Sequence, residues 1–276
     1  MNILIGAVVV ALVTAVGITA MLLVRRGAPD GSYFADGDRA SGVFGVLATG
    51  FSVLLGFIVF LAFTTYDESR AGAEAESVVV AQQLQTAQFF PEPVRTELTA
   101  QLLCYAQDVA GDEWDQLEAG TLGDSVNPWG VAMYQTLLRF HPADDLEQST
   151  FDRWLDQTEA RQDARNDRVH AVAGVIPTPL WIVLFFVSAV IFAFMLFFAD
   201  SSERKTTQAM LMGAVTATIT TLLLLIVFFD RPFNEGVGGL QPDSMERTLD
   251  IIDQNLDDLG ITVDPPCDDR GVATDA

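Results

Sequence analysis

Residues that commonly carry enzymatic chemistry are scarce in this sequence. The 276 residues include only two histidines, His141 and His170, and a single lysine, Lys205. There is no nucleophile-elbow pattern, no phosphate-binding glycine loop and no pair of histidines at the spacing of metal ligands. We therefore expect that the protein is not an enzyme, that it holds no metal ion and no cofactor, and that both histidines have ordinary polar roles.

Positive charge is also in short supply. The chain has 15 lysine and arginine residues against 37 aspartate and glutamate residues, which gives a net charge of −22. No segment forms a basic patch, and so strong a negative charge repels the phosphates of DNA and RNA. Nucleic acid is therefore excluded as a partner.

Four long stretches contain no ionisable side chain. Each has roughly 20 mostly apolar residues, enough to cross a hydrocarbon core of about 30 Å as a helix. These stretches therefore contain no side chain that could relay protons or bind a charged substrate. We predict a multi-pass integral membrane protein in contact with the lipid bilayer. The predicted spans are Ile3–Val24, Gly42–Thr64, Leu180–Ala199 and Met210–Phe229.

The negative charge comes from two segments. Residues 65–176 carry 20 acidic and 7 basic residues, and residues 230–276 carry 12 and 3. With two spans on each side of residues 65–176, both segments lie on the same side of the membrane. The two short connections contain basic residues, which the positive-inside rule places in the cytoplasm, so we expect the acidic segments of this cell-membrane protein outside. These basic residues are Arg25, Arg26, Arg39, Arg204 and Lys205.

The two cysteines, Cys104 and Cys267, fall one in each acidic segment. If these segments are outside the cytoplasm, a disulfide can join the tail to the domain before it. The alternative is two unpaired thiols, with Cys104 acting as a small buried hydrophobe. Both interpretations stay open.

The remaining chain has helical patterns and no strand pattern of useful length. The second apolar stretch continues without glycine or proline after Gly72, so we expect its helix to extend well beyond the bilayer and to end near Phe89. Residues 110–129 are expected to form a loop with about one turn of helix, and residues 265–276 to be disordered. Ser149 or Thr150 offers an N-cap for a long helix. Further helices are predicted at 94–109, 130–140, 151–175 and 244–259.

These elements predict an all-α membrane protein with four transmembrane helices and a helical soluble domain between the second and third. The tail helix is amphipathic and should pack on the soluble domain. The expected parts are two spans (1–64), the acidic soluble domain (65–176), two further spans (177–229) and the acidic tail (230–276).

One pattern in the tail resembles a metal site. Asp253, Asn255, Asp257 and Asp264 fall at positions 1, 3, 5 and 12 of a calcium-loop template. The template requires glycine at position 6 and glutamate at position 12, where this chain has Asp258 and Asp264. The solvated face of the tail helix explains the same acids, so we expect no calcium loop.

Charged side chains of opposite sign lie on the helices that adjoin spans two and three. Arg161, Arg165 and Arg168 form a basic stripe at i, i+4 and i+7, and the helix after the second span carries Glu76. The two helices are expected to leave the membrane side by side. We therefore expect an ion pair between Glu76 and Arg165; the alternative is two solvated faces.

The second span has the most informative pattern. Small residues on it, among them Ser52 and Gly56, allow close helix contact. Another face repeats at a 4-3-4 spacing, and a ring of its apolar side chains from several subunits would make a hydrophobic constriction that gates by dewetting. From spacing alone, contact with lipid or a neighbouring helix explains this face as well. The residues of the face are Val53, Phe57, Phe60 and Thr64.

Two segments resemble a known family. The run Ser52–Val59 resembles the pore-lining second helix of bestrophin anion channels, which has a Ser-Phe-Val-Leu-Gly-Phe-type run. After the last span, Asp230, Pro232 and Phe233 look like the acidic-x-Pro-Phe segment that follows the last bestrophin helix. The whole layout, over about residues 1–250, is more similar still to the bacterial bestrophin-like domain family. The further matching features are Arg25-Arg26, Glu76, Asp163-Ala164-Arg165 and the Pro177-to-Trp181 start of span three.

The resemblance implies a homo-oligomer, a tetramer or pentamer, around a central axis lined by the second helix, with Val53 and Phe57 at the constriction. Two features depart from the bestrophin pattern. The Arg-Trp motif after helix two is absent, with Glu68-Ser69-Arg70 near its place. Bestrophins also keep their soluble part in the cytoplasm, whereas the short connections of this chain place it outside. We take topology from the local charges and architecture from the resemblance.

Two functions follow as hypotheses. The first is an oligomeric ion channel with an acidic vestibule, which concentrates cations within a Debye length of about 8 Å at physiological salt. Anion selectivity is therefore not carried over, and we expect cations to permeate at least as readily as anions. The second is a non-conducting membrane sensor or scaffold whose acidic domain binds a partner or cations.

Overall fold

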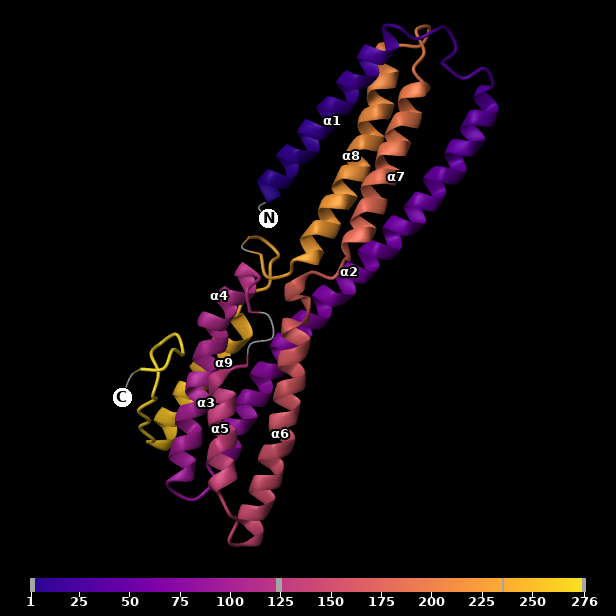
Figure 1. The fold of residues 1–276 in the computed structure, drawn as a ribbon. Helices are drawn as coiled ribbons and strands as arrows, with labels where there is room; N and C mark the ends of the chain where they lie inside the picture. Colours follow the sequence, from indigo (N-terminus) through magenta and orange to yellow (C-terminus); the bar gives the residue numbers. More distant parts are fainter. Residues whose placement is uncertain (1–2, 123–125, 235, 275–276) are drawn as a thin grey trace. The chain divides into compact units, whose positions relative to one another are not determined.

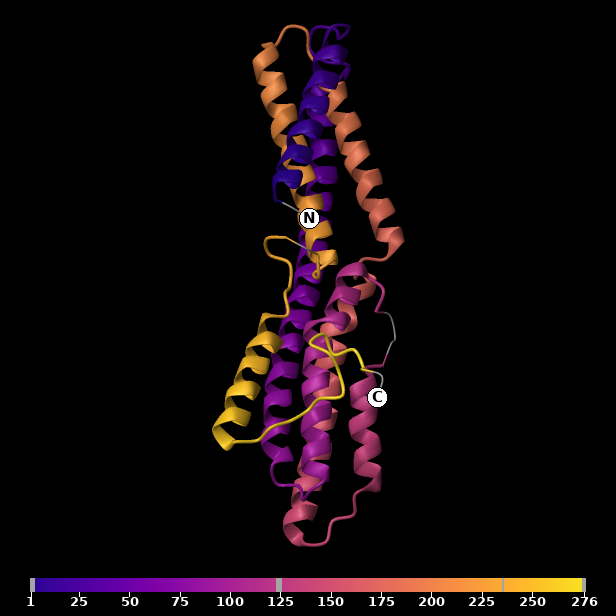
Figure 2. The ribbon, with the colours of Figure 1, turned by 90° about the vertical axis from the view of Figure 1, so that its left-hand side faces the viewer.

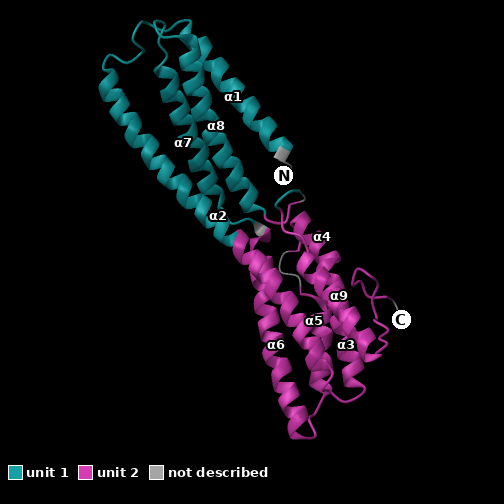
Figure 3. Cartoon of the chain, turned by 180° about the vertical axis from the view of Figure 1, so that it is seen from behind, with its two compact units in different colours: residues 1–65, 174–231, 235–238 teal, residues 66–173, 232–234, 239–276 magenta. Residues whose placement is uncertain are grey.

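The computed structural model describes residues 3–122, 126–234 and 236–274 (Figure 1). Their regular structure is helical apart from one isolated β-bridge, which confirms the predicted all-α class. The chain forms two compact units (Figure 3). Unit 1 comprises residues 1–65, 174–231 and 235–238, and unit 2 comprises residues 66–173, 232–234 and 239–276.

Within the described residues, four helices are long and apolar enough to cross a membrane, which confirms the predicted number of spans. Three of them lie in unit 1, together with the first part of the fourth. They are α1 (Ile3–Arg25), α2 (Gly37–Ala87), α7 (Thr178–Phe197) and α8 (Lys205–Asp230).

Helix α1 packs along α8 at a short distance because glycines lie at the contact (Figure 1). A Cβ atom added to Gly17 would lie 2.8 Å from the Thr216 hydroxyl oxygen, and one added to Gly213 would lie 3.1 Å from Cδ1 of Ile18. Larger residues at these positions would push the two helices apart.

Helix α2 is a single helix of 51 residues. At 1.5 Å per residue it is about 75 Å long, more than twice the thickness of a hydrocarbon core of about 30 Å. It belongs to unit 1 up to Thr65 and to unit 2 from Tyr66 onward. The prediction that this helix continues beyond the bilayer is confirmed.

In its described residues, unit 2 is a bundle built around the end of α2 and five further helices. Its main core buries Leu98, Leu102 and Trp154 completely. Helix α9 lies beside α2 (Figure 2), where the Ser244 and Thr248 hydroxyls donate hydrogen bonds to the carbonyls of Ala73 and Ser77. The five helices are α3 (Val94–Ala110), α4 (Asp112–Ala119), α5 (Pro128–Arg139), α6 (Asp145–Val169) and α9 (Asp243–Leu259), and a 3₁₀ turn, His170–Ala173, follows α6.

Two helices begin earlier than predicted. Helix α6 begins at Asp145, six residues before the expected position, because Asp144 caps it by accepting a hydrogen bond from the backbone N–H of Glu147 at 2.8 Å. Helix α5 begins at Pro128 behind an Asn127 cap, two residues early. Between 110 and 129, α4 makes two turns where about one was expected; residues 123–125 of that segment lie outside the described residues.

The expectation of a disordered C-terminus was wrong for residues 265–274. A disulfide joins Cys104 on α3 to Cys267, with 5.8 Å between their Cα atoms. The Trp129 indole N–H donates a hydrogen bond of 2.7 Å to the carbonyl of Gly271. Gly271 has a φ of +78°, and an added Cβ would lie 2.2 Å from the backbone nitrogen of Asp108, so only glycine fits there. Residues 275–276 lie outside the described part of the chain.

Candidate pore helix and buried ion-pair cluster

Helix α2 has two different faces within unit 1. On one face Leu55 and Ile58 are buried in a cluster with side chains of α7 and α8. On the other face Val53 and Phe57 expose 69% and 66% of their surface. The 4-3-4 spacing therefore identifies a face that its own subunit does not cover.

The other residues predicted for this helix lie on or next to the same open face. Phe60, Ser52 and Gly56 are exposed, and Thr64 is half-buried. A Cβ atom added to Gly56 would meet no atom within 4 Å, so this glycine is not required by packing inside the subunit.

The open face offers few polar groups. The Ser52 hydroxyl donates its hydrogen bond to the Ala48 carbonyl, and the Thr64 hydroxyl donates to the Phe60 carbonyl, both at 2.8 Å. The remaining side chains of the face are apolar. A pore lined by it would hold water weakly at its narrowest point.

The last residue of α8 has a structural role in unit 1, and the segment that follows it has one in unit 2. The Asp230 carboxylate accepts hydrogen bonds of 2.8 Å from the backbone N–H groups of Val175 and Ile176, which fixes the chain before α7. In unit 2, Pro232 is buried, and Phe233 packs edge-on against Trp114 with 5.5 Å between ring centroids.

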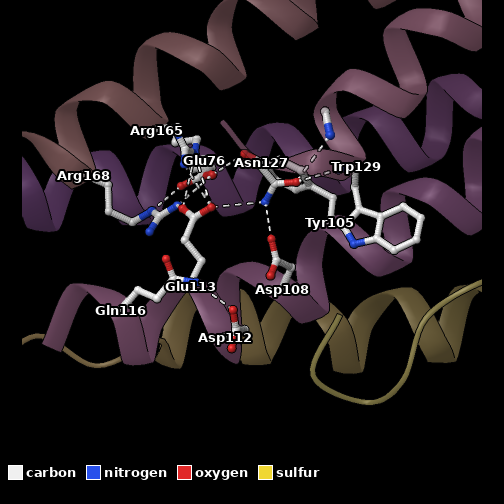
Figure 4. Close-up of polar contacts among 11 residues, drawn as sticks. Glu76, Tyr105, Asp108, Asp112, Glu113, Gln116, Asn127, Trp129, Arg165 and Arg168 are labelled. Atoms are coloured by element: carbon white, nitrogen blue, oxygen red, sulfur yellow. Dashed lines mark hydrogen bonds and ion pairs between the residues drawn. The ribbon is translucent and has the colours of Figure 1, made fainter. Parts of the chain in front are cut away.

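Unit 2 contains a cluster of buried charged side chains (Figure 4). Glu76 on α2 and Arg168 on α6 form an ion pair of 2.5 Å, and neither side chain is exposed. The Tyr105 hydroxyl donates a hydrogen bond to Glu76. Glu113 on α4 forms ion pairs with Arg168 and with Arg165, the latter at 3.1 Å.

The expected pair between Glu76 and Arg165 needs correction. Both residues belong to this cluster, but Glu76 forms its ion pair with Arg168, and Arg165 forms its ion pair with Glu113. The reason is the close approach of α2 to α6 at Gly72, where an added Cβ would lie 2.5 Å from the backbone nitrogen of Arg168. The sequence missed Glu113 because it lies in a segment that was expected to be mostly loop.

The cluster continues toward the surface through Asn127. Its side-chain amide donates hydrogen bonds to Asp108 at 2.7 Å and to Glu113 at 3.2 Å, while its oxygen accepts from the backbone N–H of Trp129. Figure 4 shows these contacts. One amide therefore connects α3, α4 and the start of α5.

The pKa values of two carboxyl groups in this cluster, Asp108 and Glu113, are shifted in opposite directions. Burial, reinforced by the Glu113 and Asp112 carboxylates, raises the pKa of Asp108 to about 7. Burial also acts to raise the pKa of Glu113, but the Arg168 and Arg165 guanidiniums outweigh it and lower that pKa. Glu113 is thus held as a carboxylate, whereas Asp108 changes charge near neutral pH.

The ion pairs of this cluster connect α2, α4 and α6. Its charged groups face one another, and burial excludes solvent from Glu76 and Arg168. Among residues 3–122, 126–234 and 236–274, no group of three or more acidic, histidine or cysteine side chains is placed to hold a metal ion.

Comparison with known proteins identifies the family. A family model described as the bestrophin-like domain matches residues 8–245. No curated protein matches the chain.

Solved structures of a bacterial bestrophin homologue from Klebsiella pneumoniae have the same fold. A crystal structure of that homologue is 13% identical, with a TM-score of 0.66 over 95% of this chain and 100% of that chain. A point-mutant form is 12% identical, with a TM-score of 0.69 over 91% and 99% of the two chains. The family model covers most of the sequence, and the chain therefore belongs to the bestrophin-like family.

Proposed function

We propose that this protein is an ion channel, a homo-oligomer in which α2 of every subunit lines a central pore. The observation that carries the proposal is the open face of α2, with Val53 and Phe57 about two-thirds exposed on a helix whose opposite face is packed. Membership of the bestrophin-like family and the fold shared with the bestrophin homologue support it. The assembly is a tetramer or pentamer.

The narrowest part of this pore is formed by apolar rings. Val53, Phe57 and Phe60 supply the side chains, and Thr64 lies at the end of the same face. Such rings close a pore by dewetting and open it when a small increase in radius lets water enter. Ser52 and Gly56, which are small, let neighbouring α2 helices approach closely.

The acidic unit sets which ions gather at the wide end of the pore. Residues 65–176 and 230–276 together carry 32 acidic and 10 basic residues. Repeated in every subunit, this charge concentrates cations and depletes anions near the mouth. We therefore propose that cations permeate at least as readily as anions.

The acidic unit lies outside the cytoplasm in this proposal. Five basic residues in the two short connections support that orientation by the positive-inside rule. The disulfide between Cys104 and Cys267 supports it independently, because disulfides persist in oxidising compartments and are rare in the cytosol.

Current through planar bilayers tests the channel. We expect wild-type oligomers to conduct and Phe57→Ala to conduct more, because the constriction loses an aromatic ring. Phe186→Ala is the matched control, since Phe186 on α7 is 67% exposed and off the proposed pore. In a salt gradient, the reversal potential gives the selectivity. Well-folded oligomers that carry no current in any of these forms would overturn the channel and leave a non-conducting sensor or scaffold whose acidic unit binds a partner or cations.

A further inference from the structure

Unit 1 contains an apolar crevice that the proposed pore does not use. It has a volume of about 460 Å³ and is lined by α1, α7 and α8, which lie side by side in Figure 1. Val13 and Gly17 line it from α1, and Trp181, Phe185 and Ala189 line it from α7. These helices are among the candidate membrane spans, so the crevice opens toward the hydrocarbon of the bilayer.

Water is a poor occupant of this crevice. A buried water molecule needs two to four polar partners, and the lining offers three hydroxyl groups, on Ser188, Thr216 and Thr220. Two of them donate to carbonyls of their own helices: Ser188 to Leu184 at 2.7 Å, and Thr216 to Met212 at 2.8 Å. The occupant must therefore be apolar.

The dimensions identify the kind of apolar occupant. On α7 the crevice extends from Trp181 to Met195, which is about 21 Å at 1.5 Å per residue. A hydrocarbon chain is long, thin and apolar, so it matches both the length of the crevice and its apolar lining. We propose that this crevice binds one acyl chain of a membrane lipid.

The aromatic residues at one end of the crevice suit this ligand. Trp181 lies in the first turn of α7, two residues after Pro179, and its indole stacks on Phe185 with 5.8 Å between ring centroids. Tryptophan is favoured where hydrocarbon meets the polar interface of a bilayer. The chain enters beside Trp181 and extends along α7 toward Met195.

Tryptophan fluorescence with a brominated lipid tests the site. The chain has four tryptophans; Trp114, Trp129 and Trp154 are buried in unit 2, so Trp181 is the one in unit 1. The protein is reconstituted in phosphatidylcholine with brominated acyl chains, which quench tryptophan on contact, and is then moved into lipid-free detergent. The variant Trp181→Phe gives the fluorescence of the other three tryptophans, which is subtracted as background.

Two alanine-to-phenylalanine variants separate a bound chain from ordinary lipid contact. Ala189→Phe fills the crevice, whereas Ala193→Phe places the same ring one turn along α7, outside the lining. We expect Trp181 to stay at least twofold quenched in detergent for the wild type and Ala193→Phe, and to recover in Ala189→Phe. Native mass spectra of the wild type should show one retained lipid per subunit.

Full recovery of Trp181 emission in the wild type, or equal quenching in both variants, would overturn the proposal. If Ala189→Phe does not fold, the wild-type mass spectrum decides, since a subunit that retains no lipid contradicts the site. The channel proposal is unaffected by either result, because Val53 and Phe57 do not line the crevice.

Discussion

Arg168 on α6 forms a fully buried ion pair with Glu76 on α2, although 92 residues separate them in the sequence. Removing two charges from water is costly, and a buried pair is tolerated only when further hydrogen bonds satisfy its members. Tyr105 donates one to Glu76 and Glu113 accepts one from Arg168, whose Nη1 atom has no hydrogen-bond partner among the described residues. The pair therefore fixes where α6 meets the helix that continues into the membrane unit.

Arg168→Met should be strongly destabilising. It leaves the Glu76 and Glu113 carboxylates buried without this cation, and breaking a buried ion pair from one side costs about 3–5 kcal/mol. Thermal or denaturant unfolding of the purified protein in detergent measures the loss. The control is Arg70→Met, because the Arg70–Glu74 pair is exposed on both sides and exposed pairs contribute little. Equal effects of the two substitutions would show that the buried pair does not hold the helices together.

Two glycines of α2 should respond differently to alanine. At Gly72 a Cβ would lie 2.5 Å from the backbone nitrogen of Arg168 and 2.8 Å from the carbonyl oxygen of Ala164, so Gly72→Ala forces α2 and α6 apart and should cost about 1–3 kcal/mol. Gly56→Ala meets nothing within the subunit and should leave its unfolding unchanged while weakening subunit assembly. Unfolding midpoints and oligomer mass in detergent measure the two effects. A destabilised subunit in Gly56→Ala with unchanged assembly would contradict the neighbouring-helix contact.

Asp108 should make stability depend on pH. Its pKa is raised to about 7 from an ordinary value of 3.8, so the folded state binds this proton more tightly than the unfolded state does. The stabilising contribution is therefore complete below about pH 4, declines as the pH rises toward 7, and is absent above it.

Asp108→Asn imitates the protonated side chain and should abolish this dependence. We expect the melting temperature of the variant to exceed that of the wild type at pH 8 and the difference to shrink toward pH 4. If the melting temperatures of the wild type and the variant change with pH in the same way between pH 4 and pH 8, the pKa of Asp108 is not raised.

The disulfide should stabilise unit 2 and hold the C-terminal segment. Removing a native disulfide typically costs about 2–5 kcal/mol, so Cys104→Ser with Cys267→Ser should lower the unfolding midpoint and expose residues 261–274 to protease. Alkylation of the unfolded, unreduced protein followed by mass spectrometry checks the bond directly. Two alkylated cysteines in the wild type would contradict both the bond and its support for the orientation.

The sequence alone predicts those features that follow from composition and from the spacing of apolar residues. An uncharged run of about 20 residues has few alternatives to a membrane span, and the run from Glu68 to Ala87 without proline predicts that α2 continues. The open face of α2 follows in the same way, because Leu55 and Ile58 fall on the opposite side from Val53 and Phe57.

The sequence alone does not predict which residues pair when they lie far apart along the chain. Arg165 and Arg168 are three positions apart and lie on one face of α6, so their spacing does not decide which of them meets Glu76. That choice depends on the contact at Gly72 and on Glu113, which enters from α4. The ordered tail likewise depends on a disulfide that joins residues 163 positions apart, and the sequence alone does not distinguish this bond from two unpaired thiols.

The central claim is that the open face of α2 lines a water-filled pore, and cysteine accessibility tests it most directly. Both native cysteines are in the disulfide, so a cysteine introduced at Phe57 or Leu55 is the one reactive thiol. We predict that a charged, water-soluble thiol reagent reduces bilayer current through Phe57→Cys and leaves current through Leu55→Cys unchanged. Current through Phe57→Cys that is insensitive to the reagent, or block at Leu55→Cys instead, would contradict the claim.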